Sequence, residues 1–167
     1  MSAPTASQSE NIGDNIAAGF VTVLTQDTAG TTLAAFGPRM PLEMPKNRIE
    51  VRSGGFIRAN DLMNFTSTGT AYYNYRRGTL SVTVVTQRHS QINTGVSSQH
   101  GAMVGRVRYL LSRGAQKMTA VIIGGYGMLD IIDQGDNYRA DETTETDRTE
   151  LRFQIDLVIP PANYLDS

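Results

Sequence analysis

The stretch that decides the fold is DETTETDRTELRFQIDLVIPP, Asp141 to Pro161. Its first part is acidic and rich in threonine, and it leads directly into a segment, Arg148 to Ile159, in which apolar and polar side chains alternate. The apolar positions are Leu151, Phe153, Ile155, Leu157 and Ile159, and the polar ones are Glu150, Arg152, Gln154 and Asp156. This alternation predicts a strand with one buried and one solvent-facing side, as antiparallel sheets allow.

A second alternating region lies upstream, in TAYYNYRRGTLSVTVVTQRHS, residues 70–90. A tyrosine-rich run and a valine-rich run flank Arg76, Arg77 and Gly78. A short connection that contains glycine between two such runs is typical of a β-hairpin. We therefore predict a hairpin whose tip exposes Arg76 and Arg77.

Two segments have helical periodicity instead. SENIGDNIAAGFVTVLTQ, residues 9–26, places apolar side chains at helical spacing after a capping residue. SSQHGAMVGRVRYLLSRGAQ, residues 97–116, does the same, with a serine cap at its start and Gly114 at its end.

The remaining segments are short strands and connections. Arg48 to Arg52 predicts a short strand that ends at Gly54-Gly55, a turn or bulge, and TAVIIGG (119–125) and MLDIID (128–133) predict further strands. The glycine- and proline-rich stretch 29–46 predicts a long loop. Because the hairpin implies antiparallel pairing, we expect an α+β fold, a mainly antiparallel sheet with the helices packed on one face. We expect one domain over 10–167, preceded by a flexible N-terminal tail over 1–9.

Composition narrows the range of partners. The chain has 167 residues, enough for one domain with a substantial core, and a formal charge of -1 from 15 basic and 16 acidic side chains. This balance provides no overall field that would hold nucleic acid or an anionic membrane. Without cysteine, disulfides and thiolate metal sites are excluded. No apolar run approaches the ~20 residues that cross a bilayer, so we expect no membrane partner and synthesis in the cytoplasm.

No motif for catalysis is complete. The two histidines, His89 and His100, are not spaced as metal ligands, and we expect His100 to be a buried, hydrogen-bonded residue of the second helix. The glycines in IIGGYGMLD lack the residues that complete a phosphate-binding loop. We therefore predict that the protein is not an enzyme and that it has no catalytic residue, cofactor or metal. Two other classes stay open: a metal-dependent hydrolase that uses Asp130 or Asp133, and a nucleic-acid-binding module that uses the arginines of the second helix.

The order of these segments resembles a known family. RIEVRSGGF, YRRGTLSVTVVTQRHS, GAMVGRVRYLLS, MLDIID and TELRFQIDLVI follow one another between about residues 49 and 159. In this order and pattern the chain resembles the tail terminator group among the neck and tail-completion proteins of long-tailed bacteriophages. A head-completion protein or another tail-tube component has nearly the same pattern.

The resemblance implies a structural virion protein at the phage neck. Tail terminators assemble as rings, commonly of six copies, that cap the tail tube and join it to the head connector. The implied partners are copies of the chain itself, the major tail tube protein and the head connector or stopper protein. DNA passes through the ring without specific binding.

In such a ring the acidic stretch has an expected role. Carboxylates repel DNA phosphates, whereas basic side chains bind them. Our hypothesis is that Asp141, Glu142, Glu145 and Asp147 line or border the channel, or face a basic patch on a neighbouring subunit. The alternative is a solvated loop without a partner.

Overall fold

The computed structural model describes residues 12–25, 35–37, 41–58, 74–88, 98–118 and 127–159. The predicted tail (1–9), part of the predicted loop (29–46) and the predicted strand at 119–125 lie outside these ranges. Within the loop range the structure places a two-residue strand. The elements in chain order are α2 (Ile12–Thr25), β1 (Ala35–Phe36), β2 (Arg48–Ser53), β3 (Ile57–Arg58), β4 (Asn74–Gln87), α3 (Ser98–Met118), β5 (Gly127–Asp141) and β6 (Thr146–Ile159).

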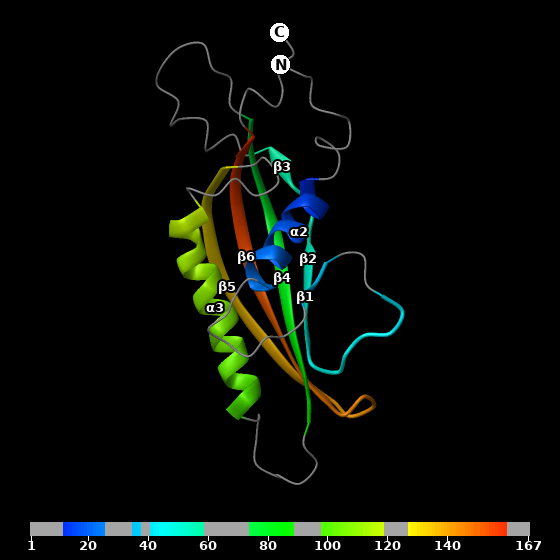
Figure 1. The fold of residues 1–167 in the computed structure, drawn as a ribbon. Helices are drawn as coiled ribbons and strands as arrows, with labels where there is room; N and C mark the ends of the chain where they lie inside the picture. Colours follow the sequence, from blue (N-terminus) through cyan, green and yellow to red (C-terminus); the bar gives the residue numbers. More distant parts are fainter. Residues whose placement is uncertain are drawn as a thin grey trace, which may run out of the picture.

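The strands form one sheet in the order β1-β2-β4-β6-β5, and β3 pairs with β4 beside β2 (Figure 1). All pairings are antiparallel except that of β1 with β2. Three long strands dominate the sheet, since β4 and β6 have 14 residues each and β5 has 15. The predicted α+β class is confirmed.

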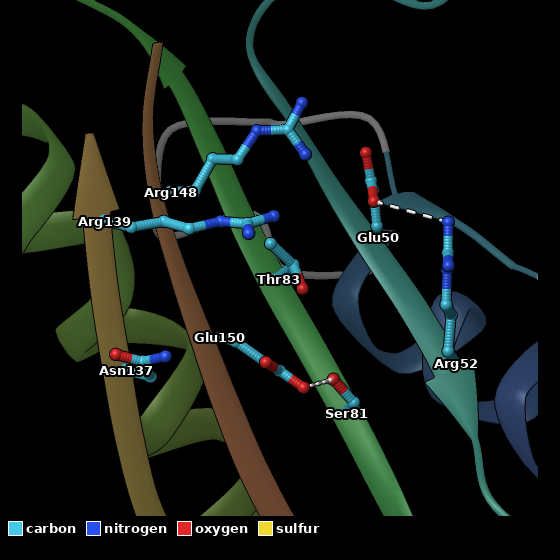
Figure 2. A pocket seen from close by; sticks show the side chains of 8 residues that line it. All are labelled: Glu50, Arg52, Ser81, Thr83, Asn137, Arg139, Arg148 and Glu150. Carbon is cyan, nitrogen blue, oxygen red and sulfur yellow. Dashed lines mark hydrogen bonds and ion pairs between the residues drawn. The ribbon is translucent and has the colours of Figure 1, made fainter. Parts of the chain in front are cut away.

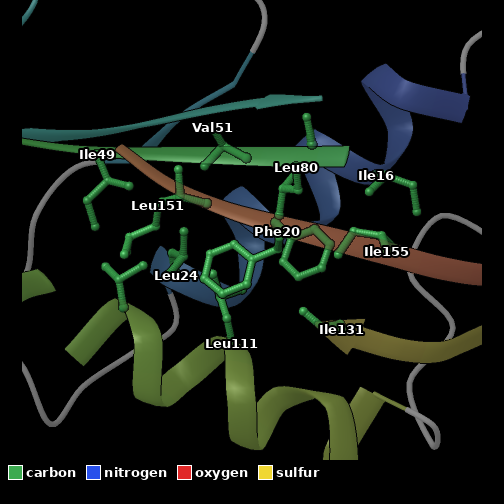
Figure 3. Packing of buried hydrophobic residues seen from close by; sticks show 14 of the residues in the cluster. Ile16, Phe20, Leu24, Ile49, Val51, Leu80, Leu111, Ile131, Leu151 and Ile155 are labelled. Carbon is green, nitrogen blue, oxygen red and sulfur yellow. The ribbon is translucent and has the colours of Figure 1, made fainter. Parts of the chain in front are cut away.

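Both helices cover the same face of the sheet, as predicted. The inward positions of β4 and β6 alternate as the sequence indicates, with Leu80, Val82, Leu151 and Phe153 buried. Side chains of both helices complete this core (Figure 3): Ile16, Phe20 and Leu24 come from α2, and Met103, Val107 and Leu111 come from α3. Each fully buried side chain of this size contributes about 1.5–3 kcal/mol relative to exposure. The residues between these positions, such as Ser81, Thr83 and Glu150, place polar side chains on the opposite face.

The predicted hairpin at Arg76-Arg77-Gly78 is wrong. Strand β4 passes through these residues without a turn, and Gly78 pairs with Ile155 of β6 inside the ladder. The glycine has a different reason: a Cβ at Gly78 would lie 2.6 Å from ring carbons of Phe56. Gly78 thus provides room for an aromatic ring packed on the strand.

The glycine pair after β2 is a bulge, one of the two forms predicted. Three residues, 54–56, separate β2 from β3, whereas only Gly78 and Thr79 separate their partners on β4. The Gly54 N–H donates to the Thr79 carbonyl oxygen at 2.8 Å, so the ladder continues past the extra residue.

The hairpin of the sheet lies between β5 and β6 instead. Strand β5 contains the predicted MLDIID segment but continues to Asp141, with two register irregularities and a positive φ of 104° at Gly135. The acidic stretch forms the turn of this hairpin, whose tip projects beyond the end of the sheet, away from α3 (Figure 1).

Candidate assembly surface

The turn of the β5–β6 hairpin is organised by its first acidic residue. The Asp141 carboxylate accepts hydrogen bonds from the backbone N–H groups of Thr143 at 3.1 Å and Thr144 at 3.3 Å. The Thr144 hydroxyl and these N–H groups stabilise the anion and hold the pKa of Asp141 below its ordinary value. At the other end of the turn, Glu145 has a φ of 51°, a left-handed conformation uncommon for residues other than glycine.

The four predicted acidic residues do not form one surface. Asp147 points into the protein, where it is 1% exposed, accepts a hydrogen bond from the Tyr138 hydroxyl at 2.8 Å and lies 3.5 Å from Arg88 Nε. Glu142 is exposed and pairs with Arg88 at 3.0 Å, which raises the pKa of that guanidinium. Glu145 is exposed as well. Of the four, Glu142 and Glu145 are exposed at the tip, whereas the Asp141 side chain is 30% exposed and Asp147 is buried.

A buried polar cluster lies beside Asp147. The imidazole of His100 contacts the hydroxyls of Thr86 at 2.7 Å and Thr149 at 2.8 Å, one through each ring nitrogen. Burial lowers the pKa of His100, against the attraction of Asp147, so the ring is neutral at pH 7. The expectation of a buried, hydrogen-bonded histidine is confirmed. With both nitrogens engaged, this imidazole holds α3 against the sheet.

The two arginines of the predicted hairpin tip lie within β4. Arg77 donates two hydrogen bonds to the Asp156 carboxylate, at 2.8 and 3.1 Å, across the β4–β6 ladder. Asp156 is 4% exposed, so this pair is largely removed from water. Arg76 is half-buried opposite Leu157. Neither arginine is at a protruding tip.

The face of the sheet opposite the helices carries a depression of about 390 Å³ (Figure 2). Four strands, β2, β4, β6 and β5, contribute two residues each. The lining residues are Glu50, Arg52, Ser81, Thr83, Asn137, Arg139, Arg148 and Glu150. The polar alternation of β6 predicts Glu150 on this face, but the sequence gives no sign of Arg139 and Asn137, because the polar second half of β5 has the composition of a loop.

Both carboxylates of the depression already have partners. Glu50 accepts from Arg48 Nε at 2.7 Å and lies 3.9 Å from Arg52. Glu150 accepts from the Ser81 hydroxyl at 2.8 Å and from Arg152 at 3.3 Å. The bonds from Arg152 and then Ser81 hold the pKa of Glu150 below its ordinary value.

The side chains named for the two alternative functions, hydrolase and nucleic-acid binding, include several with hydrogen-bond partners within the protein. Asp133 and Asp136 both accept from Arg108 of α3, at 2.7 and 2.8 Å, and Asp130 accepts from the Ile131 N–H. Across the described residues, no three His, Cys, Asp or Glu side chains are grouped as a metal site would require. In the same part of the chain, neither helix is long and apolar enough to cross a membrane.

Comparison with known proteins identifies a similar fold. No protein-family model and no curated protein sequence matches the chain. The structure is similar to a chain in the solved structure "Virion of native gene transfer agent (GTA) particle", with a TM-score of 0.57 and 13% sequence identity. The similarity covers 89% of this chain and 96% of that chain. At this identity the two chains share a fold, over nearly the full length of both.

Proposed function

We propose that this protein is a structural component of a phage-type virion. The observation that carries the proposal is the fold shared with a chain of a gene transfer agent particle, which extends over 96% of that chain. A match of this extent concerns a whole subunit, and the subunit it matches was solved as part of a virion.

Within the virion, we propose a ring of six copies at the neck that caps the tail tube and joins it to the head. Its partners are the major tail tube protein on one side and the head connector or stopper protein on the other, and DNA passes through the ring without specific binding. The order of segments that resembles tail terminators supports this position.

The contacts of the described residues favour a binding role over catalysis. His100 is buried and neutral, and Asp147 contacts Tyr138 and Arg88. Arg108 forms ion pairs with Asp133 and Asp136 at the register irregularity of β5. A catalytic base needs access to substrate and a pKa near the working pH, and these groups stabilise the fold instead. Polar groups at the hairpin tip and on the open face of the sheet are accessible, so another chain can reach them there.

Deletion of the gene in the strain that produces the particles tests the proposal. We expect free heads together with tails of uncontrolled length in electron micrographs, and a plasmid copy should restore joined particles. Tails of normal length without heads would instead indicate a head-completion role, and the absence of tails would indicate a tail-tube component. Joined, functional particles without this protein would refute a structural role.

A further inference from the structure

Two arginines oppose each other directly on the open face of the sheet. Arg139 of β5 and Arg148 of β6 are partners in the β5–β6 ladder. Figure 2 shows both side chains extending toward β4 on the same side of the sheet. Like charges at directly opposed positions destabilise an antiparallel pair. The arrangement is therefore unfavourable for the isolated subunit unless an anion lies between the two groups.

The described residues satisfy these two groups only in part. Arg148 forms an ion pair with Asp141 at 3.7 Å, but its Nε is buried without a hydrogen-bond partner. Arg139 is exposed and forms no ion pair or hydrogen bond with the described part of the chain. The carboxylate of Glu150 is already bonded by Arg152 and Ser81. It attracts Arg139 electrostatically but forms no hydrogen bond with it.

The charge of the depression favours a single carboxylate as its ligand. Three guanidinium groups and two carboxylates line it, so the lining side chains carry a net charge of +1. Duplex DNA binds through several phosphates at once, and Glu50 and Glu150 would repel them. A side-chain carboxylate, by contrast, forms strong paired hydrogen bonds with guanidinium groups.

The chain itself presents a carboxylate of this kind. Glu145 is exposed at the projecting hairpin tip, in a left-handed conformation, and has no ion pair with the described residues. Glu142, on the same tip, is already paired with Arg88. Glu145 is therefore the carboxylate of this tip that is available to a second chain.

We propose that Glu145 of one copy binds between Arg139 and Arg148 of the adjacent copy. The contact joins two different surfaces, the tip of one subunit and the sheet face of the next, and contacts of this kind close into a ring where the rotation between subunits closes. This inference rests on the proposed function, which requires that copies of the chain assemble with each other.

Cross-linking between two tagged populations tests the contact. The natural chain has no cysteine, so Glu145→Cys in one population and Arg139→Cys in a second, longer-tagged population introduce single reactive thiols. A short bis-maleimide linker is suitable, because a disulfide requires Cβ atoms within about 4.5 Å, closer than an arginine–glutamate pair brings them. Lys46→Cys, also at an exposed position, replaces Glu145→Cys in the matched control.

We expect at least fivefold more cross-linked heterodimer from the Glu145 and Arg139 pair than from the control pair, at the highest soluble concentration. Charge reversal provides the second measurement: Glu145→Arg and Arg139→Glu should each weaken self-association at least tenfold in sedimentation, and their combination should restore it. Heterodimer at the control level overturns the proposal. Salt-dependent binding of a short DNA duplex that Arg139→Glu abolishes would also overturn it, because the site would then hold phosphate.

These outcomes are separable from those of the gene deletion. Cross-linking without a defect in the deleted strain would keep the contact and refute the role in the virion. Free heads and overlong tails without cross-linking would keep the neck role and show that the ring closes through other surfaces.

Discussion

Replacement of Gly78 by alanine tests the most specific packing contact in the sheet. The new Cβ would lie 2.6 Å from two ring carbons of Phe56 and 2.7 Å from a third. Carbon atoms in contact rest about 3.5–4.0 Å apart, so the ring must retreat by about 1 Å. Phe56 packs against the core, which limits this movement. Overpacking of this kind costs about 1–3 kcal/mol, and we expect the free energy of unfolding to fall by about 2 kcal/mol.

Urea unfolding followed by circular dichroism measures this loss, with an unchanged slope showing that only stability changed. Gly55→Ala is the matched control, because a Cβ there meets no atom within 4 Å. The double variant Gly78→Ala with Phe56→Ala should lose less unfolding free energy than the two single variants added together, by at least about 1 kcal/mol. The reason is that the added methyl has room once the ring is removed. A neutral Gly78→Ala, or strict additivity with Phe56→Ala, would refute the packing explanation of this glycine.

Three further predictions concern the helix, the histidine and the buried ion pair. Gly105→Ala, on the exposed side of α3 with open space around its Cβ, should stabilise the protein by about 0.5–1 kcal/mol in the same urea assay, and a loss would contradict it. Because the pKa of His100 is lowered in the folded state, the unfolded chain binds the proton first as the pH falls below about 6.5; stability should therefore be complete above that pH and fall below it by at most about 1.4 kcal/mol per pH unit. Thermal unfolding between pH 7 and 5 should show a smaller slope in His100→Gln, and an identical slope would exclude this residue as the cause. Arg77→Met should cost about 2–3 kcal/mol by leaving Asp156 buried without its partner, and adding Asp156→Asn should recover part of the loss, whereas an unchanged midpoint would show the pair to be dispensable.

The periodic elements could be predicted from the sequence because their signal is local. Every second residue of β6 faces the core, and α3 repeats its apolar side chains each turn, so the pattern of burial is present in the order of residues. The predicted class and the predicted placement of the helices on one face follow from these patterns.

The prediction from the sequence was wrong where the role of a glycine depends on residues distant in the chain. The local sequence around Gly78 is compatible both with a turn and with a strand beneath the ring of Phe56. Only the packing of Phe56, 22 positions earlier, distinguishes the two. Likewise, the polar second half of β5, with Gly135 at its irregularity, has the composition of a loop but is held as a strand by its pairing with β6.

The sequence alone therefore determined which segments alternate, which are helical, and that acidic residues gather before the last strand. Only the tertiary structure decided that Asp147 is buried while Glu145 is exposed, and that Arg139 stands opposite Arg148. The physical reason is that periodicity depends on neighbours along one strand, whereas a side chain's electrostatic surroundings depend on strand register, which brings together residues far apart in the chain.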